Sequence, residues 1–233
     1  MLLYLCGHSC PDIAFAVHQC ARFTFAPRRS HEVALKRIGR YLKGTLDKGL
    51  ILDPRDDFLL ECYPGADFAG LWGYEDPNDP SCVKSRAGWV ITLAGCPIEW
   101  RSSLIQLICL SSMESEYVSM SMAMKDLLPA INLVHELGGC LGVPIQDVTN
   151  IHVRVHEDNV GALTLGKLEP RRMTPRSKHY ACRYHWFRSH IAPHGDRSIE
   201  LVKISTENQL GDLFTKGLVR VPFERLRKKL MGW

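Results

Sequence analysis

Acidic side chains stand at four places where a helix or strand is predicted to begin or end. Glu116 lies one turn inside a long predicted helix, and Asp158 directly follows a predicted strand. Asp212 lies in the last predicted core helix, and Asp67 follows a strand that is predicted to end at Tyr63. Carboxylate oxygens are the hard ligands that Mg²⁺ and Mn²⁺ prefer. A single acid on a helix is usually a solvated surface residue. The interpretation of these acids as metal ligands therefore depends on all four together and not on any one of them.

The segments around these acids predict a mixed α/β sheet flanked by helices. Apolar residues with a period near 3.6 predict helices over 12–25 and 30–43. Short runs rich in β-branched and aromatic residues, bounded by Gly, Pro and Asp, predict strands. These strands cover residues 49–52, 58–63, 87–93, 98–100, 106–110, 151–156 and 199–204. Further helices are predicted after Asn159, over 180–191 and 207–216, and in an amphipathic basic tail over 223–230.

The long helix that carries Glu116 has a recognisable start. Ser111 followed by Glu114 fits a capping box, in which the serine accepts a hydrogen bond from the helix and the glutamate bonds back. Glu114 is therefore expected to serve the helix start and not a metal, since residues two apart cannot share a helix face. Pro129 is expected to kink this helix, and Gly138 and Gly139 to end it.

Length, charge and cysteine content limit the class of protein. A chain of 233 residues can bury one full core with a smaller satellite domain. The formal net charge of +4 is a mild basic bias that is compatible with a polyanionic partner. Nine cysteines without a CxxC pair argue against a secreted disulfide framework. With no signal peptide and no apolar run long enough for a membrane span, we expect an intracellular protein, cytoplasmic or nuclear, that has no membrane partner.

Several motifs, in order, resemble the ribonuclease H region of the Ty1/copia-type retrotransposon Pol polyproteins. That family has a strand ending Tyr-Val-Asp-Ala-Asp, a Lys-Ser-Arg-x-Gly segment, a Leu-Ser-Thr-x-Glu-Ala-Glu-Tyr helix start, an Asp-Asn pair, Arg-Ser-Lys-His and Asp-Leu-Phe-Thr-Lys. The matching segments here are 63–70, 84–89, 110–117, 158–159, 176–179 and 212–216. The resemblance implies a ribonuclease H-like, mixed five-stranded sheet flanked by helices.

The N-terminal part resembles the end of the reverse transcriptase region in the same polyproteins, through residues 11–17 and 31–45. We therefore expect a helical remnant over 1–48, a ribonuclease H-like domain over 49–218 and a basic tail over 219–233. No Tyr-x-Asp-Asp motif is present, so polymerase activity is not expected. An intact element would place a polymerase region upstream, and a structural connection module inside a larger polymerase remains an alternative.

By this resemblance, the catalytic set corresponds to position 65, Glu116, Asp158 and Asp212. Such a set would hold two Mg²⁺ or Mn²⁺ ions that hydrolyse the RNA strand of an RNA/DNA hybrid. One ion would activate water and the other would stabilise the leaving oxygen. Basic side chains that could contact phosphates, or form only a solvated basic face, are Arg86, Arg176, Lys178, Arg183 and Lys216.

The first acid of the set is missing, because Gly65 stands where the family has aspartate. Asp67 lies on the same face of the strand, but about 6.5–7 Å further along it, and is a poor substitute given the strict geometry of Mg²⁺. Pro64 is expected to weaken the strand further by removing a donor. We therefore predict that hybrid cleavage is lost or severely weakened while the fold is retained. The alternative is a catalytically dead remnant that at most binds nucleic acid.

Overall fold

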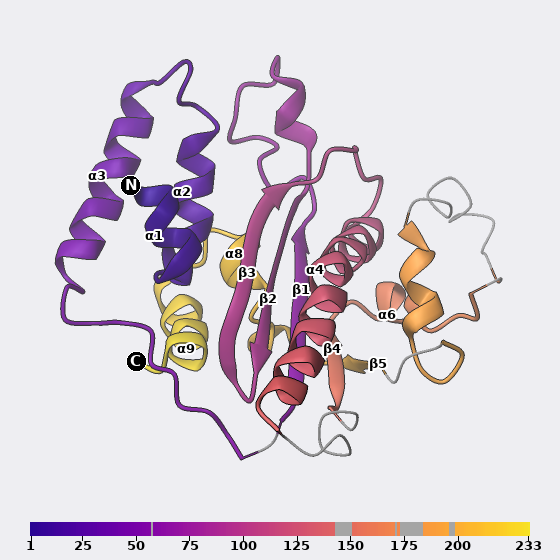
Figure 1. The fold of residues 1–233 in the computed structure, drawn as a ribbon. Coiled ribbons are helices and arrows are strands. Elements are labelled where there is room, and N and C mark those ends of the chain that lie inside the picture. The colour runs from indigo at the N-terminus through magenta and orange to yellow at the C-terminus, as the bar shows by residue number, and fades with distance from the viewer. Residues whose placement is uncertain (57, 143–150, 171, 173–183, 196–198) are drawn as a thin grey trace.

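The computed structural model describes residues 1–56, 58–142, 151–170, 172, 184–195 and 199–233. Its centre is a five-stranded sheet in the order β3-β2-β1-β4-β5 (Figure 1). β1 pairs antiparallel with β2, which pairs antiparallel with β3, whereas β1, β4 and β5 run parallel. The strands are β1 (Leu60–Asp67), β2 (Arg86–Leu93), β3 (Cys96–Leu104), β4 (Val153–Glu157) and β5 (Ile199–Lys203). The expected mixed five-stranded sheet flanked by helices is confirmed.

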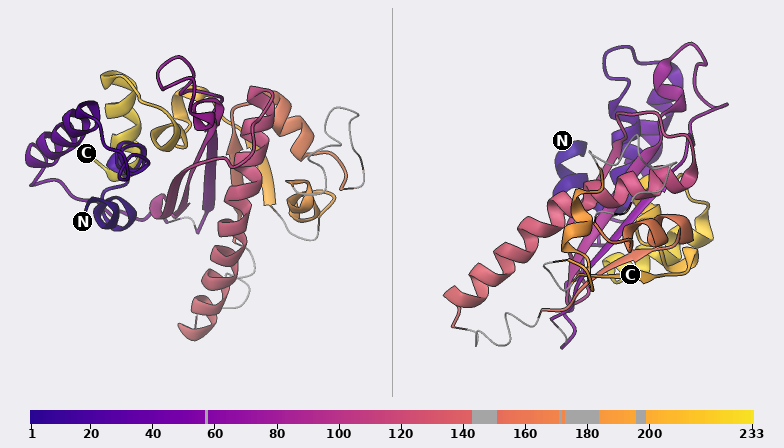
Figure 2. Two further views of the ribbon diagram at one scale, coloured as in Figure 1. Left: turned by 90° about the horizontal axis from the view of Figure 1, so that it is seen from above. Right: turned by 90° about the vertical axis from the view of Figure 1, so that its right-hand side faces the viewer.

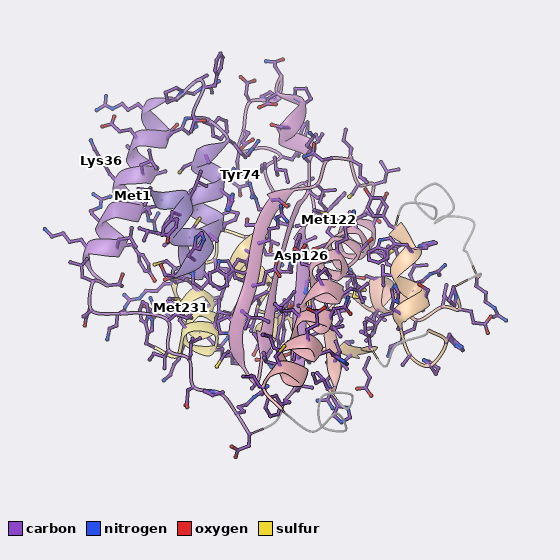
Figure 3. All side chains as sticks on the ribbon, in the orientation of Figure 1. Met1, Lys36, Tyr74, Met122, Asp126 and Met231 are labelled. Atoms are coloured by element: carbon purple, nitrogen blue, oxygen red, sulfur yellow. The ribbon has the colours of Figure 1, made fainter. Side chains whose placement is uncertain are left out.

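One face of the sheet is covered by α4 (Ser112–Cys140) and, beyond β4, by α6 (Val160–Gly166) and the 3₁₀ helix η3 (Trp186–His190). Alternate strand residues such as Cys62, Trp89 and Val155 point into the main apolar core on this face. The indole N–H of Trp89 donates to Asp126 Oδ2 at 3.1 Å, which ties β2 to α4, the helix on which Figure 3 labels Asp126. The C-terminal part of α4 extends beyond the sheet (Figure 2).

The opposite face is covered by α8 (Asp212–Thr215), α9 (Arg220–Met231) and the N-terminal helices (Figure 2). The N-terminal helices are α1 (Leu2–His8), α2 (Ala14–Ala21) and α3 (Arg29–Lys43), and the short 3₁₀ turns are η1 (Pro11–Ile13), η2 (Pro80–Val83) and η4 (Thr206–Asn208). Ile13, Val17 and Ile38 share a second apolar core with Phe214 and Leu226. The first and last segments of the chain are therefore packed together.

Close approach of α8 to the sheet depends on glycine. A Cβ added at Gly88 would lie 2.5 Å from Phe214 Cβ, and one at Gly211 would lie 2.7 Å from the Tyr63 carbonyl oxygen. Neither distance is possible for a side chain, so a larger residue at either position would push α8 away from β1 and β2. Gly88 is the register partner of Gly65, and this pair lies beneath α8.

Two predicted strands are wrong. Residues 49–52 have no strand structure; Ile51 donates one backbone hydrogen bond to Met231, and both Ile51 and Leu52 are exposed. Residues 106–110 form an irregular link between β3 and α4. Both runs are short and apolar, but neither has a neighbouring strand, and a ladder needs a partner as well as a pattern.

The helix starts are partly as expected. Ser111 caps α4 by accepting from the Glu114 N–H at 3.1 Å, and the Glu114 carboxylate accepts from the Leu110 N–H at 2.9 Å. α3 begins at Arg29, and the His31 side chain in its first turn accepts from the Arg28 N–H at 2.9 Å. α4 continues through Pro129 to Cys140, one residue beyond the expected glycine pair. None of the described helices is both long enough and apolar enough to cross a membrane.

Candidate metal centre

Three carboxylates meet where α4 begins and β4 ends. Glu116 lies in the second turn of α4, Glu157 is the last residue of β4, and Asp158 follows it. Their ligand oxygens all lie within 4.8 Å of one another. Within the part of the chain that the structure describes, no other group of three or more His, Cys, Asp or Glu residues has this property.

The start of α4 is fixed against the end of β1. The Ser119 hydroxyl donates to the Gly65 carbonyl oxygen at 2.7 Å in a buried position, one helical turn after Glu116. Because β1 and β4 are parallel, their carboxyl ends lie at the same edge of the sheet. The helix start, the end of β1 and the end of β4 therefore converge on one small region.

Two of these acids are buried without enough hydrogen-bond donors. Glu157 is 0% exposed and Glu116 is 9% exposed. Among the described residues, neither Glu116 Oε2 nor Glu157 Oε2 has a hydrogen-bond partner. Burial raises the pKa of Glu157 to about 8, and the charge of Asp158 adds to this. Burial also raises the pKa of Glu116, with further increases from Glu157 and Asp158. Buried, unpartnered carboxylate oxygens fit a hard divalent cation.

Asp212 lies at the start of α8, next to this group but outside it. Its Oδ1 is 2.7 Å from Lys216 Nζ, one helical turn further on. Burial raises the pKa of Asp212, and Lys216 partly offsets this. Although burial alone would lower it, the pKa of Lys216 is raised by Asp212, Glu116 and Asp158. The ammonium of Lys216, predicted as a nucleic-acid contact, thus lies in the electrostatic field of the acids.

Asp67 is not brought into the three-acid group. A Cβ added at Gly70 would lie 1.6 Å from Asp67 Oδ2, so the carboxylate fills the space above that glycine. Burial raises the pKa of Asp67, while Lys216 and Arg86 act in the opposite direction. The carboxylate is oriented toward the turn after β1 and not along the strand toward Glu116.

Gly65 faces α8, on the side of the sheet opposite α4. A Cβ added there would lie 3.4 Å from the Gly211 carbonyl carbon and 3.7 Å from the Asp212 nitrogen. These are ordinary van der Waals distances, so a side chain can start at this position without moving the backbone. An acid at position 65 would lie next to Asp212.

Pro64 lies where β1 has lost its pairing with β4, which ends at Cys62, but keeps its pairing with β2. The Leu60 N–H points toward β4 and donates to the His152 carbonyl at 3.0 Å, so the nitrogen of residue 64 also points that way. In the parallel register, its acceptor would be the His156 carbonyl. That oxygen instead accepts from Gln209 Nε2 at 2.9 Å, and Gln209 is fully buried. The strand thus lacks the ladder donor at Pro64, as predicted, but a side-chain amide satisfies the carbonyl that this donor would have reached.

Glu157 was missed in the sequence, where Asp158 was the only acid considered at the end of this strand. Its signal is the alternation along β4, in which Val153, Val155 and Glu157 share the face that packs against the main core. An acid at a position where the pattern requires a buried apolar residue is unusual. It indicates either a buried ion pair or a ligand site.

Of the other residues predicted to contact nucleic acid, only Arg86 lies within the part of the chain that the structure describes. Arg86 is 3% exposed and donates to Gln19 Oε1 at 2.5 Å and to Ser102 Oγ at 3.1 Å. Its side chain is used in packing α2 onto the sheet, and a phosphate contact at Arg86 stays a prediction. Arg176, Lys178 and Arg183 lie outside the described residues.

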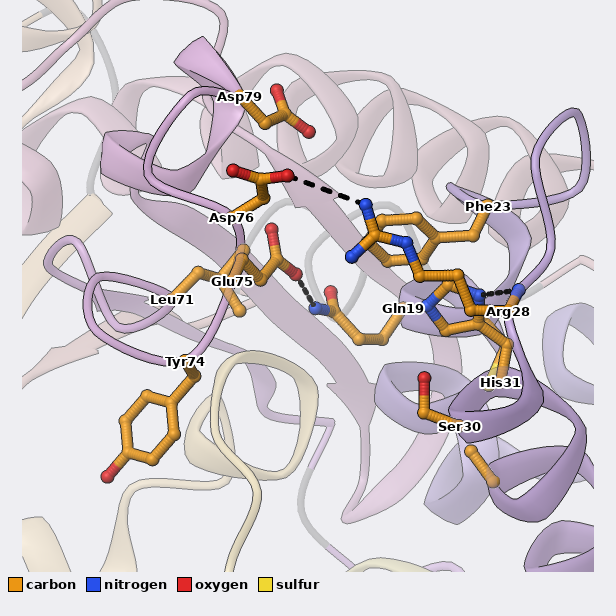
Figure 4. Close-up of a pocket in the computed structure, with 12 residues that line it drawn as sticks. Gln19, Phe23, Arg28, Ser30, His31, Leu71, Tyr74, Glu75, Asp76 and Asp79 are labelled. Atoms are coloured by element: carbon orange, nitrogen blue, oxygen red, sulfur yellow. Dashed lines mark hydrogen bonds and ion pairs between the residues drawn. The ribbon is translucent and has the colours of Figure 1, made fainter.

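A cavity of about 380 Å³ lies elsewhere, between the N-terminal helices and the loop that includes residues 71–79 (Figure 4). Glu75 accepts from Gln19 Nε2 at 2.8 Å and from Arg22 Nη1 at 2.7 Å. Arg28 reaches Asp76 across the opening at 3.5 Å. The charged groups here are paired with one another, which distinguishes this cavity from the acids at the edge of the sheet.

Comparisons with known proteins give similar sequences over nearly the whole chain, whereas no family model matches. The chain is 33% identical over 220 residues to the retrovirus-related Pol polyprotein from transposon RE2 of Arabidopsis thaliana, covering 94% of this chain and 14% of that protein. It is 33% identical over 234 residues to the corresponding polyprotein from transposon TNT 1-94 of Nicotiana tabacum, covering 99% of this chain and 16% of that protein. The chain thus spans only a small part of these relatives.

Among solved structures, LC11-RNase H1 in complex with an RNA/DNA hybrid is 16% identical with a TM-score of 0.41. The match covers 67% of this chain and 93% of that protein.

Proposed function

Because the chain belongs to the copia-type retrotransposon Pol polyproteins, of which it spans a segment, we propose that it is their ribonuclease H segment. In this proposal, Glu116, Asp158 and Asp212 hold divalent cations, Mg²⁺ or Mn²⁺, and the substrate is the RNA strand of an RNA/DNA hybrid. Catalysis is weak because position 65 provides no carboxylate. The observation that carries the proposal is the convergence of Glu116 and Asp158, from motifs far apart in the sequence, at one edge of the sheet.

The chemistry follows from what the residues can do. Bound divalent cations would activate a water molecule and stabilise the leaving oxygen of the scissile phosphodiester. Glu116 and Asp158 provide carboxylate oxygens from two elements whose relative position is fixed by packing, and Glu116 Oε2 has no protein donor among the described residues. Asp212 contributes from the other side of the sheet, where Lys216 neutralises part of its charge.

Gly65 weakens this arrangement at one specific point. An aspartate there would lie between the end of β1 and Asp212, on the α8 side. Without it, no acid from β1 joins the group from α4 and β4, since Asp67 is directed over Gly70. Hydrolysis that needs two ions is therefore expected to lose one of its bridging ligands.

The test is cleavage of a labelled RNA/DNA hybrid by the purified chain in Mg²⁺ or Mn²⁺. We expect slow cleavage that EDTA abolishes and that Glu116→Ala removes, while Glu136→Ala, an exposed acid on the same helix, leaves it unchanged. Gly65→Asp should raise the rate about tenfold or more, without any change at Pro64. Rapid cleavage by the unaltered chain would contradict the weakening. A folded Gly65→Asp protein with no activity would contradict the enzyme.

A second candidate function is nucleic-acid binding by a catalytically inactive remnant, which Gly65 and the Lys216–Asp212 ion pair both favour. The same variants separate the two. If the hybrid binds the unaltered chain and Gly65→Asp restores no cleavage, the binding function is favoured.

A further inference from the structure

The catalytic set proposed above leaves Glu157 unused, although Glu157 is the most deeply buried acid of the three-acid group. Its side chain is held in one orientation because Oε1 accepts from the Asn159 N–H at 2.9 Å. The other oxygen, Oε2, is buried and without a hydrogen-bond partner among the described residues. A fully buried carboxylate with one oxygen held and the other unsatisfied is costly unless something else binds it.

We infer that Glu116, Glu157 and Asp158 together hold one divalent cation on the α4 side of the sheet, with Glu157 as a direct ligand. This inference deepens the cation-binding part of the proposed function and rests on it for the roles of Glu116 and Asp158. It does not require that the bound ion support hydrolysis.

The separation of the ligand atoms fits a shared ion. Ligand oxygens of all three residues lie within 4.8 Å of one another. Two oxygens on opposite sides of a calcium-sized ion are about 5 Å apart, and neighbouring ones are closer. A small movement of the side chains would adjust the same set to the shorter bonds of Mn²⁺ or Mg²⁺.

Among the residues that the structure describes, alternatives within the protein do not satisfy these acids. Two buried carboxyl groups can share a proton in a direct hydrogen bond, but Oε2 of Glu116 and Oε2 of Glu157 both lack a partner among the described residues. A basic side chain could neutralise them, but Lys216 Nζ is bonded to Asp212 at 2.7 Å. A cation is the species that would satisfy both oxygens at once.

The side of the sheet on which Glu157 lies determines how many divalent cations we expect the site to hold. Glu157 lies on the face of β4 that packs against α4, whereas Gly65 faces α8. Glu157 therefore does not take the place of the missing acid; it moves the site toward α4. On the α8 side, the ammonium of Lys216 already provides a positive charge next to Asp212. With glycine at position 65, the arrangement holds one divalent cation and one internal ammonium; the second ion of the proposed catalytic set needs the acid that is missing there.

The test measures Mn²⁺ binding by the chain alone, by calorimetry and by the loss of the free-ion electron paramagnetic resonance signal. We expect one site per chain. Glu157→Gln keeps the size of the side chain and an oxygen for the Asn159 N–H, and should weaken Mn²⁺ binding about tenfold or more. Glu136→Gln and Asp67→Asn should leave binding unchanged. Circular dichroism and a thermal melt of the metal-free proteins establish that each variant is folded.

Unaltered Mn²⁺ binding by folded Glu157→Gln, two equivalent ions per chain, or no binding at all would each overturn the inference. Glu157→Asp provides a second check, because shortening the side chain should also weaken binding while keeping the charge. Since no nucleic acid is present, a failure here is separate from a failure of the proposed function, which is decided by hybrid cleavage.

Discussion

Buried acids lie on both faces of the sheet, Glu61 of β1 on the α8 side and Glu157 of β4 with Glu116 of α4 on the other, and their surroundings differ. On the α8 side, Glu61 accepts from Arg55 Nη2 at 2.6 Å, from the Tyr63 hydroxyl at 3.1 Å, and lies 2.9 Å from His156 Nε2. On the α4 side, Glu157 and Glu116 each have a buried oxygen with no partner among the described residues. His156 and Glu157 are adjacent in sequence, so a single step along β4 separates the two groups.

The pKa values show what this difference does. Burial by itself would raise the pKa of Glu61, but hydrogen bonds with His156 and Arg55 outweigh it and lower the pKa to about 2. For Glu157, burial is again the largest effect, the bonding groups are too few to offset it, and the pKa rises to about 8. Burial alone therefore does not determine how an acid behaves. Donors distinguish a stabilising ion cluster from a site that can accept a ligand.

The largest effect on stability is expected at Gln209, whose side chain donates to the backbone carbonyl of His156, next to Glu157. Gln209→Leu removes the donor to the His156 carbonyl and the acceptor of the Gly211 N–H, which is 3.2 Å away. Leaving two buried backbone groups unsatisfied should lower the free energy of unfolding by about 2–4 kcal/mol, as measured by urea denaturation. Pro64→Val is the control and should change stability by less than about 0.5 kcal/mol. Equal effects of the two substitutions would contradict the assignment of the donor to Gln209.

The second largest effect on stability is expected at Glu61, the acid whose hydrogen-bond partners offset its burial. Glu61→Gln removes the charge that Arg55 and His156 surround, and should destabilise the protein at pH 7 by about 2–3 kcal/mol. The matched control is Glu200→Gln, which removes an exposed ion pair with Arg154 on the neighbouring strand and should cost less than about 0.5 kcal/mol. Similar losses for both variants would show that the buried cluster contributes no more than a surface pair.

The same cluster predicts a pH dependence. Because the folded pKa of Glu61 is lowered to about 2, its contribution to stability is fully present above the unfolded pKa of about 4.5 and is lost as the pH falls toward 2. The stability gap between the unaltered chain and Glu61→Gln should therefore be constant above about pH 5 and should close below it. A gap that stays constant down to pH 2 would contradict a lowered pKa.

A smaller effect, an increase in stability instead of a loss, is expected at Glu157, whose buried oxygen has no partner among the described residues. Without metal, Glu157→Gln should stabilise the protein by about 1 kcal/mol at pH 8, because it removes a buried acid next to Asp158 and offers an amide donor to Glu116. With saturating Mn²⁺ the order should reverse, since the unaltered chain binds the ion more tightly and gains more stability from binding. Thermal melts in EDTA and in Mn²⁺ measure both. A loss of stability in EDTA would mean that Glu157 serves the fold and not a ligand.

Much of the sheet could be predicted from the sequence because its strands carry strong local patterns. Residues 87–93 form β2 as predicted, and 199–204 gives β5 to within one residue. The false strands at 49–52 and 106–110 fail because a short apolar run does not reveal whether a partner strand is available. Resemblance to the family directed attention to Glu116 and Asp158, which the structure brings together.

The remaining site features depend on tertiary contacts. Glu157 could not be told from a surface acid until the buried face of β4 was known. The role of Gln209 depends on a contact with His156, 53 positions earlier in the chain, and no local pattern indicates it. The burial of Arg86 follows from its contact with Gln19, which requires α2 to be placed against the sheet.

The amide of Gln209 also changes how substitutions in this chain depend on one another. We expect a proline at position 64 to be tolerated only while glutamine remains at 209, so the two positions should be epistatic. A related chain with aspartate at position 65 could accept proline at 64 without loss, whereas the same proline would become a defect if position 209 changed. Under the proposed function, a single substitution at position 65 is then the shortest mutational route to a complete set of acids.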